Sequence, residues 1–199
     1  MRKQAYGRMR SPRRMPTQKQ LESELKRERR KGQRGSSARV VAGVAIVAAA
    51  LAALIAVFVT PVFEITGTSM TPTLEQGEYV VAIKGSKFNT TDVVAINFGS
   101  RVLVKRVIAG PGQWVNIKDT GEVTVDGHAL DEPYLTERAK GKCDIQLPYQ
   151  VPDDCYFVMG DHRSTSVDSR SSSIGCVSRA DIVGKIEATV WPLSKAGLL

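Results

Sequence analysis

Residues 40–59 are 20 consecutive positions without a charged or polar side chain, and they constrain the fold more than any other stretch of this chain. An α-helix rises about 1.5 Å per residue, so a helix of this length matches the roughly 30 Å hydrocarbon core of a bilayer. We therefore expect one uncleaved N-terminal transmembrane helix over residues 40–59. A cleaved secretory signal is the alternative, but its apolar region would be shorter and its basic region far smaller than residues 1–39.

Residues 1–39 carry 14 of the 28 Lys and Arg residues but only three acidic residues, a net charge of +11, while the remaining residues sum to −3. Such a segment cannot bury a core, so we expect it to be mostly disordered, with at most a short helix over residues 21–29. Positive charge beside a membrane helix stays in the cytoplasm, which places residues 60–199 outside. We thus expect a single-pass cell-membrane protein that contacts lipid. The alternative is a basic arm that binds nucleic acid. Only Tyr6 offers an aromatic ring in residues 1–39, so we expect no nucleic-acid partner.

Residues 60–199 are long enough for one domain with its own core. They contain short segments rich in β-branched residues and separated by turn signals. Residues 128–150 contain two prolines and few apolar runs, so we expect an exposed excursion there. The fold class is therefore mainly β, with coiled antiparallel sheets. We expect strands at residues 78–83, 92–96, 101–108, 113–118, 122–125, 156–159 and 181–191, with a hairpin turn at residues 119–121.

Three cysteines, Cys143, Cys155 and Cys176, all lie in the part placed outside the cytoplasm, where disulfides can form. We expect Cys143 and Cys155 to pair, because they bracket 11 residues that include two prolines. Closing a loop of that size stabilises a fold by roughly 3 kcal/mol in the chain-entropy model. Cys176 would then be a free thiol. The alternative is that all three are small buried side chains.

Ser69 lies in the segment Ile65-Thr66-Gly67-Thr68-Ser69-Met70-Thr71-Pro72-Thr73-Leu74, shortly after the apolar run ends. Proline fixes the backbone three positions after the serine. A serine hydroxyl is a weak nucleophile, and it needs a neighbouring base and donors for the developing oxyanion. On this segment alone, a turn residue is the alternative to a catalytic one.

Lys105 is the candidate base. Alternate residues of an extended strand share a face, so Leu103, Lys105 and Val107 lie together. An ammonium group between Leu and Val is poorly solvated, and desolvation lowers the pKa of a lysine, which is otherwise about 10.4. A neutral lysine can accept a proton from a serine. The alternative is a lysine at the solvated edge of a strand.

The segment Gly160-Asp161-His162-Arg163-Ser164-Thr165-Ser166-Val167-Asp168-Ser169-Arg170 is dense in charged and hydroxyl side chains directly after an apolar strand. It is either a solvated turn or a hydrogen-bonded scaffold that orients catalytic groups. This segment, Val104-Lys105-Arg106 and the segment around Ser69 together closely resemble the bacterial type I signal peptidases, the Ser/Lys peptidases of family S26. Their order, spacing and position behind a basic tail and an anchor also match, and Gly77-Glu78-Tyr79-Val80-Val81 is a further segment of the pattern.

The resemblance implies a membrane-anchored serine endopeptidase that removes N-terminal signal peptides from exported preproteins, without a cofactor or metal. Its partners would be those signal peptides and membrane lipid, and we expect a monomer. Ser69 would be the nucleophile and Lys105 the general base. Ser166 would orient the lysine, and Asp161, Arg163, Asp168, Arg170 and Arg106 would support the site.

Signal peptides end in small residues before the cut, so we expect an extended groove with two shallow apolar pockets. By the resemblance, the pocket residues would be Ile65, Met70, Leu74, Leu103 and Val104. Ordinary core positions are the alternative for these side chains.

Two positions depart from the family pattern. His162 stands where the pattern has Asn, and we interpret it as a hydrogen-bonding substitute that is not the base. Gly67 stands where some members carry a serine that helps bind the oxyanion, so the backbone N–H of Ser69 would do more of that work. His128 is expected at the surface.

Other protein classes fit less well. Self-cleaving repressors also use Ser and Lys but carry a DNA-binding module, for which this chain has an anchor and a basic tail instead. A sortase would need a Cys on a strand near Arg, and neither Cys143 nor Cys155 is so placed. A membrane-anchored scaffold with an inactive fold does not explain Ser69, Lys105 and Ser166 occurring together.

Overall fold

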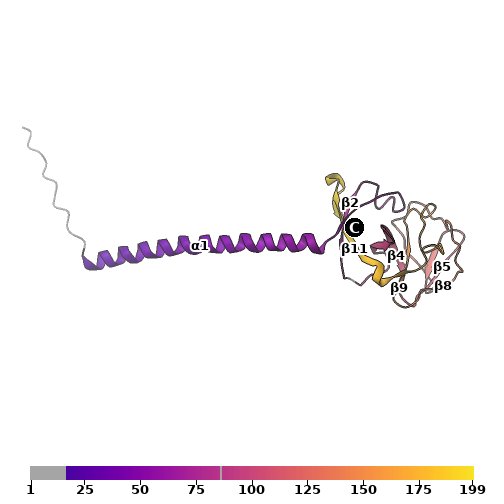
Figure 1. Ribbon diagram of the computed structural model, residues 1–199, viewed down its shortest axis with the longest axis horizontal. Coiled ribbons are helices and arrows are strands. Elements are labelled where there is room, and N and C mark those ends of the chain that lie inside the picture. The colour runs from indigo at the N-terminus through magenta and orange to yellow at the C-terminus, as the bar shows by residue number, and fades with distance from the viewer. Residues whose placement is uncertain (1–16, 86) are drawn as a thin grey trace, which may run out of the picture. The chain divides into compact units, whose positions relative to one another are not determined.

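The computed structural model describes residues 17–85 and 87–199. The chain divides into two units, Met1–Leu54 and Ile55–Leu199, and the strands of the described residues all belong to the second (Figure 1). All the site residues predicted from the sequence lie in the second unit.

Helix α1 (Gln18–Val59) is 42 residues long. Residues 18–39, which we expected to be mostly disordered, are therefore helical, and the short helix expected over residues 21–29 is part of α1. The reason is local: Lys, Arg, Glu, Gln and Leu are good helix formers, and extending an existing helix costs far less than nucleating one. Residues 1–16 of the expected tail lie outside the described residues. Among the residues that are described, no helix is long and apolar enough to cross a membrane.

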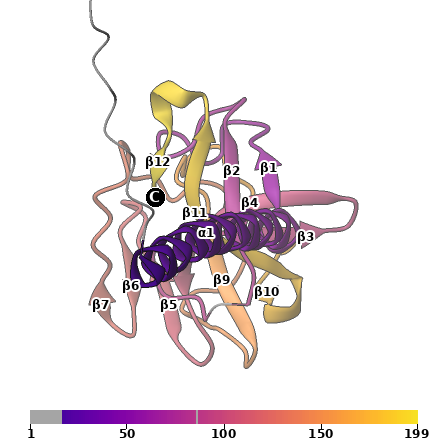
Figure 2. The ribbon, with the colours of Figure 1, turned by 90° about the vertical axis from the view of Figure 1, so that its left-hand side faces the viewer.

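The larger sheet is antiparallel, with the strand order β1-β2-β11-β3-β4-β9-β10 and with β12 paired to β11. Figure 2 shows β1, β2 and β11 side by side. Strand β4 lies inside this sheet between β3 and β9, and Lys105 pairs with Val94 of β3 while its neighbour Arg106 pairs with Met159 of β9. The strands are β1 (Val62–Glu64), β2 (Tyr79–Ile83), β3 (Val93–Phe98), β4 (Arg101–Ala109), β9 (Cys155–Met159), β10 (Val177–Ser178), β11 (Ile182–Trp191) and β12 (Gly197–Leu198).

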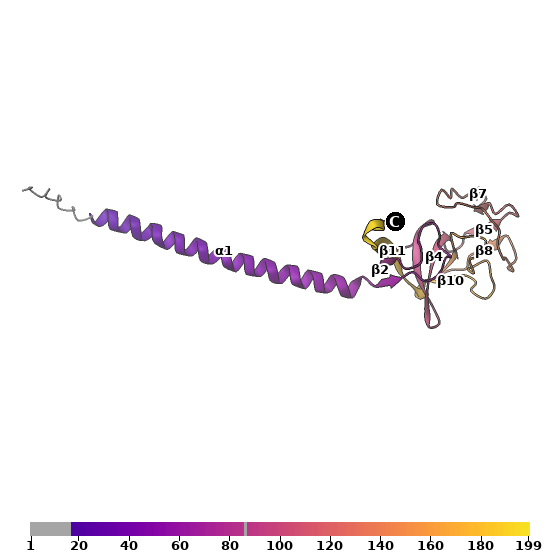
Figure 3. The same cartoon turned by 90° about the horizontal axis from the view of Figure 1, so that it is seen from above.

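The smaller sheet has the order β7-β6-β5-β8, and Figure 3 shows β5, β7 and β8 grouped at the far end of the second unit from β2 and β11. Its strands are β5 (Trp114–Ile117), β6 (Val123–Val125), β7 (His128–Ala129) and β8 (Tyr149–Gln150). The β5–β6 hairpin turns at the expected place, with Gly121 at φ 84°. Asp126 and Gly127, both with positive φ, form the two-residue turn that joins β6 to β7 and leaves His128 exposed, as expected.

The expected fold class is confirmed as mainly antiparallel β. All seven strands expected from β-branched runs are present within a few residues of the expected bounds. Five short strands of two or three residues, β1, β7, β8, β10 and β12, were missed because such lengths carry no periodic signal. Two 3₁₀ turns, Arg179–Asp181 and Leu193–Lys195, flank β11.

Three apolar clusters form the core of the second unit. One packs Ile65, Met70 and Leu74 of the Ser69 segment against β2, β3 and β11. A second joins Val94 of β3 and Val107 of β4 to β9 and β10. The third lies between the smaller sheet and the inner face of β9. Because both the Ser69 segment and strand β4 are anchored in these clusters, their side chains are held in fixed relative positions.

Candidate active site

Ser69 and Lys105 meet at the centre of the site. The Lys105 Nζ lies 2.7 Å from the Ser69 Oγ, at hydrogen-bond distance. Ser69 is half-buried, whereas the Lys105 side chain is 4% exposed. Two residues 36 positions apart in sequence are thus brought together, as the sequence pattern predicted.

The surroundings of Lys105 favour its neutral form. Lys105 pairs in register with Val94, and Leu103 pairs with Ile96, on the face where Val107 also packs. Burial among these apolar side chains lowers the pKa of Lys105. The nearby Asp168 carboxylate opposes that effect and the Arg170 guanidinium adds to it. The net result is a lysine that releases its proton more readily than one in water, as a general base requires.

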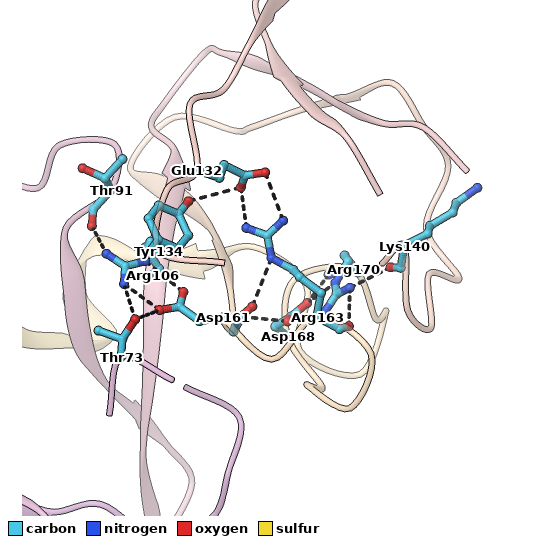
Figure 4. Close-up of polar contacts among 11 residues, drawn as sticks. Thr73, Thr91, Arg106, Glu132, Tyr134, Lys140, Asp161, Arg163, Asp168 and Arg170 are labelled. Atoms are coloured by element: carbon cyan, nitrogen blue, oxygen red, sulfur yellow. Dashed lines mark hydrogen bonds and ion pairs between the residues drawn. The ribbon is translucent and has the colours of Figure 1, made fainter. Parts of the chain in front are cut away.

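Arg106, the next residue on β4, has a different environment. Its guanidinium binds Asp161 in two places, with Nε donating to Oδ1 at 2.8 Å and an Nη donating to Oδ2 at 2.6 Å. A further Nη donates to the Thr91 carbonyl at 2.7 Å. Asp161 also accepts from the Thr73 hydroxyl at 2.5 Å, which ties the Ser69 segment to the polar loop (Figure 4). Arg106 and Asp161 therefore link all three segments of the predicted site.

The polar loop over residues 160–170 is a scaffold and not a solvated turn. Arg170 is fully buried and binds both carboxylate oxygens of Asp168 at 2.8 Å, and Asp168 also accepts from the Gly160 N–H at 2.9 Å. Burial alone would raise the pKa of Asp168, but the bonds to Arg170 and Gly160 outweigh it and lower that pKa. The Arg170 guanidinium also donates to the Arg163 carbonyl at 2.8 Å. Among the described residues, no group of three or more His, Cys, Asp or Glu could hold a metal ion.

Ser166 is buried in this loop, but it does not bind Lys105. Its Oγ has no hydrogen-bond partner among the described residues, so the expected hydrogen bond that orients the lysine is not formed. Lys105 is instead engaged by Ser69. Ser166 packs against Gly160, where a Cβ would come within 2.2 Å of the Ser166 Oγ and 2.5 Å of the Ser69 carbonyl. Glycine at position 160 is therefore required by the close approach of the Ser69 and Ser166 segments.

The two departures from the family pattern also have clear positions. The backbone N–H of His162 donates to the Ser69 carbonyl at 3.0 Å, whereas its ring Nδ1 is buried without a partner among the described residues. The side chain thus shows no hydrogen bond that would replace an asparagine, and the contact to Ser69 comes from the backbone. Gly67 has φ 95°, a conformation that an L-serine would adopt only under strain.

A groove of about 410 Å³ runs beside Ser69 and Lys105. Of the predicted pocket residues, Ile65, Met70, Leu103 and Val104 line it. Leu74 does not: it is fully buried in the core cluster beneath Ile65 and Met70, so its placement in the pocket was wrong. The reason is that Leu74 follows a turn, and its backbone N–H binds the Met70 carbonyl at 3.0 Å. Phe63, for which the sequence left open a pocket or a lipid contact, also lines the groove. Glu64, Arg101 and Val102 line it too and were not assigned to it from sequence.

Residues 128–150 are not simply an exposed excursion. Glu132 is 4% exposed, and its carboxylate binds the Arg163 guanidinium and accepts from the Tyr134 hydroxyl at 3.1 Å. The Tyr134 ring lies 3.8 Å from the Arg106 guanidinium carbon (Figure 4). Burial, followed by the nearby Glu132 charge, raises the pKa of Tyr134. Sequence reasoning missed these two residues because a lone Glu and Tyr beside a proline are usually at the surface.

The expected disulfide between Cys143 and Cys155 is absent, and all three cysteines are free thiols. The Cys155 thiol lies near Cys176, which contributes to raising its pKa. The prediction failed because it used separation along the chain, whereas the pairing of β9 with β10, which Cys176 directly precedes, brings the two segments side by side.

The chain is similar to known proteins of one family. The family described as signal peptidase, peptidase S26, matches residues 38–191. Signal peptidase I P of Bacillus subtilis subsp. natto is 34% identical over 154 residues, which cover 71% of this chain and 82% of that protein. Signal peptidase I of Bacillus amyloliquefaciens is 33% identical over 182 residues, covering 86% and 97% of the two chains.

Among solved structures, a signal peptidase I from Enterococcus faecalis V583 is 27% identical and covers 50% of this chain and 97% of that one, with a TM-score of 0.43. The family match covers most of the chain, and the relatives match over more than two thirds of it. The chain belongs to the signal peptidase family, peptidase S26.

Proposed function

We propose that this protein is a membrane-anchored serine endopeptidase that removes N-terminal signal peptides from exported preproteins, with Ser69 as nucleophile and Lys105 as general base. The observation that carries the proposal is the 2.7 Å contact between the Lys105 Nζ and the Ser69 Oγ, together with the burial that lowers the pKa of Lys105. The names of the relatives, all signal peptidases, support the choice of substrate.

In the proposed reaction, neutral Lys105 takes the proton of the Ser69 hydroxyl as the Oγ attacks the carbonyl carbon of the scissile peptide bond. The protonated lysine then gives that proton to the leaving amine as the C–N bond breaks, which leaves an acyl group on the Ser69 Oγ. Lys105, neutral again, takes a proton from water, and the resulting hydroxide releases the acyl group. The lysine passes the proton back to the serine, so the enzyme ends in its starting state.

The oxyanion that forms in each step needs positioned donors. The backbone N–H of Ser69 is the proposed donor, because glycine at position 67 has no hydroxyl to offer. The substrate would lie extended in the groove beside Ser69, where Ile65, Met70, Leu103 and Val104 offer apolar walls for small side chains. Pockets of this kind favour small residues by excluding larger ones.

We also propose that residues 40–59 anchor the protein in the cell membrane, with the N-terminus in the cytoplasm and residues 60–199 outside. The support is the 20-residue uncharged run behind a segment of net charge +11. The protein would contact lipid and signal peptides and act as a monomer. Protease added to cells stripped of their wall should degrade residues 60–199 and spare the tail, and protection of the outer part would overturn this topology.

Cleavage of a test preprotein in detergent is the direct experiment. Wild-type protein should release the signal peptide, and Ser69→Ala should not, because the nucleophile is gone while almost no cavity is opened. Ser164→Ala is the matched control, since Ser164 is an exposed hydroxyl of the polar loop, and it should cleave normally. For wild type, kcat/KM should rise with pH through an apparent pKa below the ordinary lysine value of 10.5, because the base must be neutral. Full activity in Ser69→Ala would overturn the proposal.

A further inference from the structure

Cys155 begins β9, and Cys176 directly precedes the neighbouring strand β10. In the antiparallel pairing of β9 with β10, Cys155 is opposite Ser178 and Tyr156 is opposite Val177. Side chains alternate between faces along a strand, so continuing this alternation by one residue puts Cys176 on the face of Ser178 and Cys155. The two cysteines are thus diagonal neighbours at this end of the strand pair.

The two thiols also influence each other. Burial raises the pKa of Cys155 to about 11, and the nearby Cys176 thiol adds to this shift. The Cys176 thiol and burial also raise the pKa of Tyr149 to about 12. Both cysteines are half-buried, so an external reagent can reach them. Cys143 is not among the groups in this cluster.

We propose that Cys155 and Cys176 form a reversible disulfide that ties β9 to the segment that follows the polar loop. The bridge would enclose the 20 residues between them, which include the whole of residues 160–170. Cys176 precedes β10 in a segment without regular structure, which gives the backbone room to adjust to the geometry of a disulfide. The proposed location of residues 60–199 outside the cytoplasm is where such a bond persists.

The step is a thiol–disulfide exchange with a disulfide donor of the form R–S–S–R. One cysteine thiolate attacks a donor sulfur, which breaks the donor S–S bond and releases one R–S⁻. The second cysteine thiolate then attacks the mixed disulfide, forms the Cys155–Cys176 bond and releases the other R–S⁻. The cysteine pair loses two electrons, the donor gains them, and the two protons end on the two released thiols.

The test uses the full chain purified in detergent and needs no peptidase activity, so its failure differs from failure of the proposed function. Protein treated with oxidised glutathione is alkylated and digested with trypsin without reduction. We expect a peptide with Cys176 joined to the peptide that contains Cys143 and Cys155. The bridge should persist in Cys143→Ser, the matched control, and disappear in Cys155→Ser.

The melting temperature provides a second measurement. Oxidised wild type and oxidised Cys143→Ser should melt roughly 5–10 °C above their reduced forms, because the bridge restricts the unfolded chain. Oxidised Cys155→Ser should show no such shift. A bridge that vanishes in Cys143→Ser, or three thiols that all remain open to alkylation after oxidation, would overturn the proposal.

A second set of contacts joins residues 132–134 to the two arginines of the site. Glu132 holds the Arg163 guanidinium, and Arg163 Nε also donates to the Gly160 carbonyl at 3.2 Å. Tyr134 covers the Arg106 guanidinium, whose strand carries Lys105, and donates to Glu132. Gly141, further along the same segment, passes so near the loop that a Cβ there would come within 2.4 Å of the Arg163 carbonyl.

We infer that Glu132 and Tyr134 are positioning residues that hold strand β4 and the polar loop in a fixed relative position. Neither touches Ser69 or Lys105 in the contacts of the described residues, so each acts through an arginine. A cation over an aromatic face is stabilised by the ring, and a buried carboxylate fixes a guanidinium in a planar arrangement. Loss of either contact would let β4 and the loop shift relative to each other.

Two substitutions at Tyr134 separate positioning from bulk stability. Tyr134→Phe keeps the ring over Arg106 and should retain most of kcat. Tyr134→Leu removes the ring and should lower kcat about 10-fold or more with KM little changed, because small misplacements of catalytic groups have large effects. Arg138→Gln, an exposed change in the same segment, is the control. A Tyr134→Leu protein that melts earlier but keeps the wild-type kcat below its melting temperature would show a purely structural role and overturn the inference.

Discussion

Lys105 and Arg106 are adjacent cations on strand β4, and both are buried, at 4% and 7% exposure. The Arg106 guanidinium is matched by two carboxylate oxygens, a carbonyl, and the face of an aromatic ring. The Lys105 ammonium meets only the Ser69 hydroxyl among the hydrogen bonds of the described residues, with carboxylates acting from a distance. Burial disfavours a charge at both positions, but the partners of Arg106 compensate for it, whereas the surroundings of Lys105 do not.

This difference shows how one strand can supply both structure and chemistry. Alternation sends the two side chains to opposite faces, one toward apolar residues and the other toward Asp161. A paired guanidinium stays charged and holds the segments together. An unpaired ammonium in an apolar setting gives up its proton more easily and can act as a base.

The largest expected effect on cleavage comes from replacing Lys105 by a cation that keeps its proton. Lys105→Arg should abolish cleavage, because a guanidinium stays protonated and cannot accept the serine proton. The readout is kcat/KM on a test preprotein. Lys118→Arg, on the exposed β5–β6 hairpin, is the control and should behave as wild type. Activity above about a hundredth of normal is hard to reconcile with the ~10²–10⁴ contribution of a general base, and it would rule out the Ser/Lys mechanism. A Ser-His hydrolase would instead lose activity with His162→Ala.

Removing the ion pair between Arg106 and Asp161 should cause a large loss of stability. Arg106→Met leaves the Asp161 carboxylate buried without its cation, at a cost of about 3–5 kcal/mol in the free energy of unfolding. Urea unfolding of the purified protein measures this. The double variant with Asp161→Asn should recover part of the loss, since no uncompensated charge remains. Equal stability of Arg106→Met and wild type would show that the ion pair does not hold the segments together.

A smaller loss of activity is expected from Ser166→Ala in the polar loop. The sequence pattern assigned Ser166 to orienting Lys105, but its hydroxyl makes no hydrogen bond within the part of the chain that the structure describes, and it packs on Gly160. We expect a loss of roughly tenfold in kcat/KM, well below the ~10²–10⁴ of a general base. A loss as complete as that of Lys105→Arg would mean that the hydroxyl takes part in the proton transfer itself.

Sequence was sufficient for the parts of the site that rest on short segments with strong patterns. The Ser69 segment, Lys105 on a strand and the charged loop all occupy the expected elements, and the alternation rule placed Leu103 and Val107 on the lysine face. Prediction from sequence failed where a side chain contacts a residue that is distant along the chain. Cys155 lies near Cys176 because β9 pairs with β10, the strand that follows Cys176. The buried Glu132 binds Arg163, which is 31 positions away in the sequence.

The pocket assignments show the same limit within one segment. Four of the five predicted residues line the groove, but Leu74 turns into the core, because a turn at residues 70–74 redirects the chain. An apolar residue next to a nucleophile has the same sequence signal whether it faces substrate or core. Only the packing of β2, β3 and β11 decides between the two.

The smallest expected effect is the contribution of Lys105 to the pH dependence of stability. It tests directly whether the buried charge of Lys105, unlike that of Arg106, is uncompensated. The folded-state pKa of Lys105 is lowered, so at pH values between it and the ordinary 10.5 the unfolded chain binds more protons than the folded one. Stability contributed by this site therefore rises with pH through that window, and its cost is full below the folded-state pKa. Lys105→Met removes the charge while keeping a long apolar side chain, so it should melt a few degrees above wild type near neutral pH, and the gap should narrow toward pH 10.5. Lys118→Met, at an exposed position, should show no such trend. A gap between Lys105→Met and wild type that stays constant with pH would mean that Lys105 is as well solvated as an ordinary surface lysine and is not set apart from Arg106 by its unmatched charge.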